Sequence, residues 1–361
     1  MLKTVETVKT PAVERLVKIW TRRYTLDFSH ISLDKHVYTN LVANASPEGR
    51  VLTSARLKKN LLDINCQMGC IQAKTFYSYI PNIVDLNEAR LITQFAFRVY
   101  KQTLEFYEKS SIQEHLSQIE IKENHDISVL GISEITKLAY LLEPVLLVFQ
   151  EQHIISKDWR SLGFMTTQIN FTNQLILKKL TSTEKILLTP YLKFIEEQVA
   201  MPWQRLCAKA AKYEVDSPEL NLIEQMMSAT PEIAESIYHQ LVELLPNHYS
   251  RRGELSHPSI KHSCLRDLSM FQAYLWLCFL EKSMESIERE LLSLCVMVVK
   301  GVGIKWEMTE KWCQILVDEI SNHLNTEQKM LLWPYLQEMQ QLFLKERSRL
   351  GYQEELAGGI V

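Results

Sequence analysis

Three side chains that could hold a ligand lie within one helical turn of the segment HSCLRDLSMFQAYLWLCFLEKS, residues 262–283. Cys264 supplies a thiol, Arg266 a guanidinium and Asp267 a carboxylate. At about 100° per residue, Cys264 falls on the apolar stripe of a predicted helix over 258–283. It lies near the amino end, where the helix macrodipole favours a thiolate. Arg266 lies about 200° around the helix from Cys264, so only an extended ligand could meet all three groups.

These residue types also fit a purely structural role. A free cysteine is a common core residue, and Arg266 and Asp267 could be solvated or paired with neighbouring helices. His257 and His262 lie close to Cys264 in sequence, but their spacing is not that of a known zinc site, and we expect no metal. The residues alone therefore leave both interpretations open.

The composition is that of a globular protein. The 361 residues are 46% hydrophobic and 23% charged, and the net charge of -3 gives no basic field for nucleic acid. Seven irregularly spaced cysteines favour reduced thiols and a cytoplasmic location. We expect no secretory signal in MLKTVETVKT and no membrane insertion, because no apolar run is long enough to span a bilayer.

Helical periodicity runs along nearly the whole chain, and alternation typical of strands is absent, so the predicted fold class is all-α. We expect an N-terminal helical domain over 1–175, a second helical domain over 183–347 and a loose tail over 348–361. Ser217-Pro218 and Thr230-Pro231 are each typical of a helix start, and Gly301-Val302-Gly303 is typical of a helix end.

The second domain resembles the phycobiliproteins, the phycocyanin and allophycocyanin family of cyanobacteria and red algae. The resemblance covers about 183–347 and starts from Cys-Leu-Arg-Asp before an aromatic-rich helix, which is similar to the family's bilin-attachment helix. The other similar segments, in matching order, are ATPEIAESIYHQLVELLPNHY (229–249), YSRR (249–252), LLSLCVMVVKGVGI (291–304) and TEKWCQILVDEI (309–320). The resemblance implies a globin-like helical domain.

The resemblance also implies a chromophore, a linear tetrapyrrole (bilin, or bile pigment) such as phycocyanobilin. Cys264 matches the cysteine that forms a thioether to the pigment. Asp267 matches the carboxylate that accepts the inner pyrrole N–H groups, and Arg266 matches the arginine that pairs with a propionate. No catalytic residues are implied.

Four further residues match positions around the family's pigment pocket. Lys261 stands at a position that is often basic in the family, and Tyr274 matches an aromatic wall of the pocket. Arg251 and Arg252 are similar to the family's paired arginines, but they lie further from Cys264 in sequence than in the family. The 1–175 segment matches nothing in the family.

The resemblance implies a role in photosynthesis, either in light harvesting or in light sensing. Expected partners are the phycobilisome or other phycobiliprotein subunits, in a homo- or hetero-oligomer, in the cytoplasm or peripherally at the thylakoid surface. The alternative is a non-pigmented helical adaptor that acts by protein–protein interaction in phycobilisome assembly, bilin delivery or antenna degradation. No nucleotide-binding loop, nucleophile elbow or acid–base pair is found, so we do not expect an enzyme. Two glutamate pairs, Glu196-Glu197 and Glu288 with Glu290, fit solvated helix faces.

Overall fold

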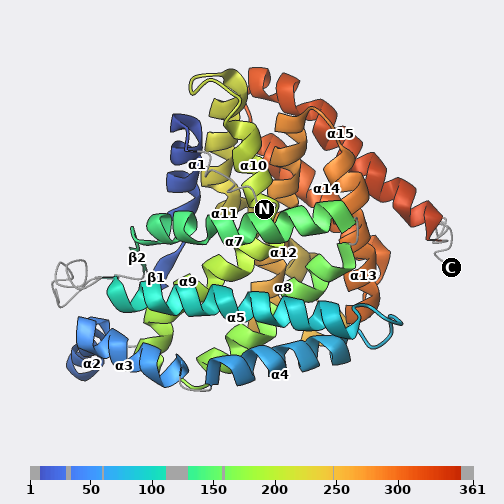
Figure 1. Cartoon of the computed structure of the whole chain (residues 1–361). Coiled ribbons are helices and arrows are strands. Elements are labelled where there is room, and N and C mark those ends of the chain that lie inside the picture. Colours follow the sequence, from blue (N-terminus) through green and yellow to red (C-terminus); the bar gives the residue numbers. More distant parts are fainter. Residues whose placement is uncertain are drawn as a thin grey trace. The chain divides into compact units, whose positions relative to one another are not determined.

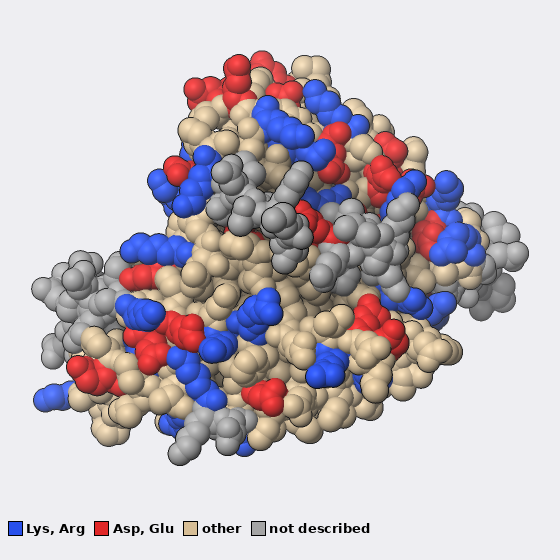
Figure 2. All heavy atoms as spheres, viewed as in Figure 1, with Lys and Arg blue, Asp and Glu red and all other residues tan. Residues whose placement is uncertain are grey.

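The computed structural model describes residues 9–29, 34–58, 61–110, 129–156, 159–246 and 248–350 (Figure 1). These residues are almost entirely helical, with four strands of two or three residues, which confirms the all-α prediction. None of the described helices combines the length and apolar composition needed to cross a bilayer. On the face drawn in Figure 2, Lys and Arg are interspersed with Asp and Glu.

The chain forms two compact units, one chiefly Glu14–Ala200 and the other chiefly Met201–Val361. The change from one unit to the other therefore follows helix α9 (Ser182–Ala200), whereas the sequence interpretation places that segment in the second domain. Each unit has its own buried apolar core.

The part of the first unit that the structure describes contains nine elements besides α9. They are α1 (Pro11–Thr21), β1 (Thr25–Asp27), α2 (Lys35–Ala45), α3 (Pro47–Lys58), α4 (Leu61–Phe76), α5 (Leu86–Lys109), β2 (Val129–Gly131), α7 (Ile135–Ser156) and α8 (Trp159–Leu177). The first residues of α1 belong to a short piece, Thr10–Val13, that is grouped with the second unit. β1 pairs antiparallel with β2, with Thr25 opposite Gly131. Asp34 and Asp85 start α2 and α5 as N-caps, because their carboxylates accept the free backbone N–H groups of Val37 and Glu88.

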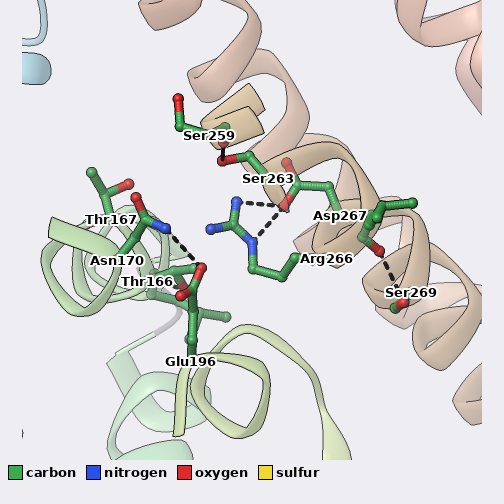
Figure 3. A network of polar contacts seen from close by, with 12 residues as sticks. Thr166, Thr167, Asn170, Glu196, Ser259, Ser263, Arg266, Asp267 and Ser269 are labelled. Atoms are coloured by element: carbon green, nitrogen blue, oxygen red, sulfur yellow. Dashed lines mark hydrogen bonds and ion pairs between the residues drawn. The ribbon is translucent and has the colours of Figure 1, made fainter. Parts of the chain in front are cut away.

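Helices α4 and α8 pack closely because α4 carries a glycine at the contact. A Cβ atom on Gly69 would lie 2.2 Å from Thr172 Oγ1 and 3.0 Å from the carbonyl oxygen of Gln168. On the same part of α8, the side chains of Asn170 and Asn173 each donate to the buried carboxylate of Glu196 at 3.0 Å. Glu196 and its neighbour Glu197 are both buried, so the prediction of a solvated face for this pair is wrong. The Asn170–Glu196 bond is drawn in Figure 3. These contacts fix α4 and α9 on α8.

Arg50 is a fully buried cation in the first unit. It donates to the carbonyl oxygens of Ala45 at 3.1 Å, Tyr107 at 3.1 Å and Ser110 at 2.7 Å, and its guanidinium lies 4.9 Å from the ring centre of Tyr107. The first two carbonyls lie in the last turns of α2 and α5 and the third at the C-cap of α5, where the helix macrodipole is negative. The two helix ends therefore offset the cost of burying this charge.

Nine elements make up the described residues of the second unit, and β3 and β4 form a short antiparallel hairpin. The elements are α10 (Trp203–Ala210), α11 (Pro218–Leu244), β3 (Tyr249–Ser250), β4 (Gly253–Glu254), α12 (Pro258–Glu281), the π-helix η1 (Ile287–Leu291), α13 (Leu292–Val302), α14 (Trp306–Asn322) and α15 (Thr326–Arg349).

Two of the three predicted punctuation signals in this unit are confirmed. The Ser217 hydroxyl accepts from the backbone N–H of Leu220 at the start of α11, and Gly303 ends α13 with a φ of 70°. The helix start predicted at Thr230-Pro231 is wrong, because Pro231 lies inside α11. Thr230 is buried there, and its hydroxyl donates to the carbonyl of Met226 in the preceding turn instead of capping a new helix.

Helix α12 lies in the core of the second unit, and its middle turns are fully buried. Phe271 stacks on Trp312 of α14 with ring centres 5.8 Å apart, and it also lies 5.5 Å from the ring of Phe343 on α15. The predicted range of 258–283 agrees with the observed Pro258–Glu281. Packing against α14 and α15 holds the middle of α12 in place.

Candidate functional site

Two elements position the candidate thiol. Cys264 lies in the second turn of α12, which starts at Pro258 and is capped by the His257 ring, and only 7% of Cys264 is exposed. The β3–β4 hairpin, which precedes α12, brings Arg252 beside this turn, with Arg252 Nη1 3.5 Å from Ser263 Oγ. The candidate site is therefore a buried thiol beside polar groups from two elements, α12 and the β3–β4 hairpin.

The electrostatics of the Cys264 thiol differ from the expectation. Burial raises the pKa of Cys264 to about 12, the Asp267 carboxylate raises it further, and the guanidinium groups of Arg266 and Arg252 lower it. The expectation of a thiolate is therefore wrong. Cys264 is the seventh residue of the helix, and the macrodipole acts mainly within the first turn, so desolvation of the charged form dominates.

Arg266 and Asp267 form an ion pair with each other (Figure 3). The Asp267 Oδ1 atom accepts from Arg266 Nε at 2.8 Å and from Arg266 Nη2 at 2.6 Å. The two side chains are 12% and 22% exposed. The long arginine side chain curls back to its neighbour, which brings together two groups whose helical positions differ.

Two further candidate residues, Lys261 and Arg251, contact other elements of the second unit. Lys261 Nζ pairs with Glu235 of α11 at 3.0 Å and lies 5.2 Å from the ring centre of Tyr238. Arg251 is exposed and lies over the backbone of α13's C-cap, where its side chain comes within 3.0 Å of the position a Cβ of Gly303 would take. The structure thus gives these two residues contacts of their own, with α11 and with the end of α13.

Tyr274 is buried ten residues further along α12 than Cys264, which is about 15 Å at 1.5 Å per residue. Burial raises its pKa well above the usual value, with the Glu290 carboxylate beside its hydroxyl. Arg205 of α10 donates to both oxygens of Glu290 at 2.6 and 2.8 Å and to Ser286 Oγ at 2.6 Å. Tyr274 therefore belongs to this second polar cluster, apart from the thiol.

The sequence interpretation missed two features of these sites. Glu290 is buried, so its assignment to a solvated face is wrong; the π-helix adds one residue to the turn and rotates this carboxylate inward. Tyr238 of α11 was not a candidate, yet it is near enough for Cys264 to affect its pKa, and its hydroxyl donates to the carbonyl of Leu255 at 2.8 Å. No sequence pattern indicates a π-helix, whereas the helical spacing of α11 places Tyr238 on the same buried stripe as Ala234 and Leu241.

Among the described residues, no cluster of three or more His, Cys, Asp or Glu side chains could hold a metal ion. The groups that could hold an organic ligand are one thiol, two guanidinium groups and one carboxylate: Cys264, Arg252, Arg266 and Asp267. They suit a ligand that has carboxylates, hydrogen-bond donors and a carbon that accepts a thiol.

The chain was compared with known proteins, and no protein-family model, no curated protein and no solved structure matches it.

Proposed function

We propose that the second unit is a globin-like, phycobiliprotein-type domain that binds a linear tetrapyrrole at Cys264. The proposal puts the chain at the phycobilisome, in light harvesting or light sensing, in the cytoplasm or peripherally at the thylakoid surface. The observation that carries it is the convergence of Arg252 from the hairpin with Arg266 and Asp267 around one buried thiol.

The residues fit the pigment in chemical type. The two guanidinium groups of Arg252 and Arg266 suit the two propionates, because a planar fork binds a carboxylate through two hydrogen bonds. Asp267 suits the pyrrole N–H groups, since an ionised carboxylate accepts several donors. Cys264 would bind covalently by adding its sulfur and its proton across a carbon–carbon double bond, which needs no oxidant. When bound, the pigment would supply absorption of visible light.

Binding requires two changes from the present arrangement. Arg266 donates two hydrogen bonds to Asp267, so that contact would be exchanged for a propionate. The thiol is buried and uncharged at neutral pH, so attachment would need local opening or a separate attachment enzyme. We therefore expect no spontaneous reaction between the free pigment and the folded protein.

The test is co-expression with the enzymes of bilin synthesis and a bilin-attachment enzyme. We expect a coloured protein whose pigment stays attached on a denaturing gel and is lost in Cys264→Ala. Cys278→Ala is the matched control, because Cys278 is buried on the same helix outside the proposed site, and this variant should keep its colour. A colourless wild-type product, made with a competent attachment enzyme, contradicts pigment binding.

A second candidate is the non-pigmented adaptor, and one observation favours it. Arg266 and Asp267 satisfy each other without any ligand, and the thiol is closed off from solvent. Such a domain could act in assembly, bilin delivery or antenna degradation through its outer helix faces. Pull-down of antenna subunits separates the two functions, because an adaptor should capture them equally well as wild type and as Cys264→Ala.

A further inference from the structure

Helix α7 in the first unit has an apolar outer face. Leu141 is 46% exposed and Val148 is 40% exposed, Pro144 between them is also exposed, and Val145 and Leu147 are half-buried. The opposite side, which includes Leu138, Leu142 and Leu146, is fully or almost fully buried. A helix that is apolar on all sides is normally covered on all sides, and a continuous exposed stripe marks an interaction surface.

Helix α5 extends this surface. The ring of Phe95 on α5 stacks on Phe149 of α7 with ring centres 4.3 Å apart, and Leu91, one turn before Phe95, is 65% exposed. We call the surface formed by Leu91, Phe95, Leu141, Pro144, Val145 and Val148 the α7 face.

The charges at the two ends of the stripe indicate what covers it. Lys137 lies in the first turn of α7, and Glu151 lies five residues before its last residue; both are exposed. Lys137 is at the unfavourable end of its own helix macrodipole. Both would be favourably placed beside a second helix that runs antiparallel.

We propose that the α7 face binds a second copy of this chain, with the two α7 helices antiparallel about a two-fold axis at Pro144. Lys137 and Glu151 are each seven residues, about 10.5 Å, from Pro144, so Lys137 of each copy meets Glu151 of the other. In the same register Leu141 meets Leu147, and Tyr140 meets Val148. An isologous contact of this kind needs one surface that is complementary to itself, as this one is.

The expected association is moderate. Two paired helices with the adjoining part of α5 form an interface at or below the standard size of about 800 Å² per partner, so a dissociation constant in the micromolar range is expected. The inference is independent of pigment binding, because the residues belong to the first unit and the test uses the unpigmented chain.

The experiment measures the mass of the full chain by light scattering or sedimentation over roughly 1 to 100 μM. Val148→Glu places a carboxylate within the apolar contact, opposite Tyr140 of the other copy, and should weaken dimerisation at least about tenfold. Leu52→Glu is the matched control, because Leu52 is 71% exposed on α3 outside the α7 face, and it should leave the dimer intact. Far-UV circular dichroism verifies that each variant is folded.

Charge reversal tests the register. Lys137→Glu and Glu151→Lys should each weaken the dimer, because each puts like charges opposite one another, and the double variant should restore it. These exposed positions keep the test decisive if Val148→Glu disturbs folding. A wild-type monomer throughout the concentration range, or a dimer that none of these variants weakens, overturns the proposal; failure of the double variant to restore the dimer overturns the antiparallel register.

Discussion

The buried Cys264 thiol should be very slow to alkylate, and Asp267→Asn should make it faster. With a pKa of about 12, about one thiol in 10⁴ is ionised near pH 8, whereas an exposed cysteine with an ordinary pKa of about 8.5 is about one quarter ionised. Because the thiolate is the nucleophile, the rate should be lower by about three orders of magnitude even before limited access is counted.

The Asp267 substitution tests the electrostatic part of this argument. Asp267 raises the pKa of Cys264 while Arg266 and Arg252 lower it, so a neutral amide at position 267 lowers the pKa. Each pKa unit changes the thiolate population about tenfold in this pH range, so we expect about a three- to tenfold faster reaction. Arg266→Gln should change the rate in the opposite direction.

Alkylation with iodoacetamide, followed by mass spectrometry of the peptides, resolves each cysteine. Cys70 is the internal comparison, since it is half-buried, and Asp318→Asn is the matched control, because Asp318 is exposed on α14. If Cys264 reacts as fast as Cys70 in the folded protein, the burial argument is refuted. If Asp267→Asn reacts no faster than wild type and Asp318→Asn, the neighbouring charges do not control the thiol.

Two further predictions concern stability, measured by urea unfolding. Gly69→Ala should destabilise the first unit by about 1–3 kcal/mol, because the new Cβ would lie 2.2 Å from Thr172 Oγ1. This steric cost should exceed the roughly 1 kcal/mol by which a helix prefers alanine to glycine. Gly131→Ala is the control, because its Cβ enters open space and the variant should be near neutral. Arg205→Met should cost about 3–5 kcal/mol near pH 7 by leaving Glu290 unpaired. Burial raises the pKa of Glu290 and Arg205 lowers it, so in Arg205→Met the folded-state pKa of Glu290 rises further. The loss of unfolding free energy should therefore shrink on acidification toward pH 5, where Glu290 of the variant is protonated. A loss that does not change with pH refutes this explanation.

Helix content and several helix ends could be predicted because they depend on local chemistry. Ser217-Pro218 starts a helix through its own side chain and ring, and Gly303 ends one because it adopts a positive φ at little cost. Pro231 carries the same local signal, yet it lies within α11. Tertiary packing of the flanking turns outweighs the backbone hydrogen bond that proline removes.

The candidate site was predictable only in part, for a similar reason. The proximity of Cys264, Arg266 and Asp267 follows from their positions in one helix. The approach of Arg252 depends on the path of the β3–β4 hairpin, and the burial of Glu290 depends on a π-helix. Sequence spacing determines neither, because both result from how the backbone packs.

The two polar clusters on α12 differ in what it would cost to rearrange them. The Arg266–Asp267 pair joins sequence neighbours within α12 and is partly exposed, so exchanging this contact for one with a ligand should cost less than opening a buried pair between two elements. The Arg205–Glu290 pair joins α10 to η1 and surrounds the fully buried Tyr274, so opening it would strand a buried carboxylate. A ligand that competes for arginine and carboxylate groups can therefore bind at the start of α12 without unfolding the domain. For this reason we expect a ligand beside Cys264, and not at the cluster of Tyr274, Arg205 and Glu290.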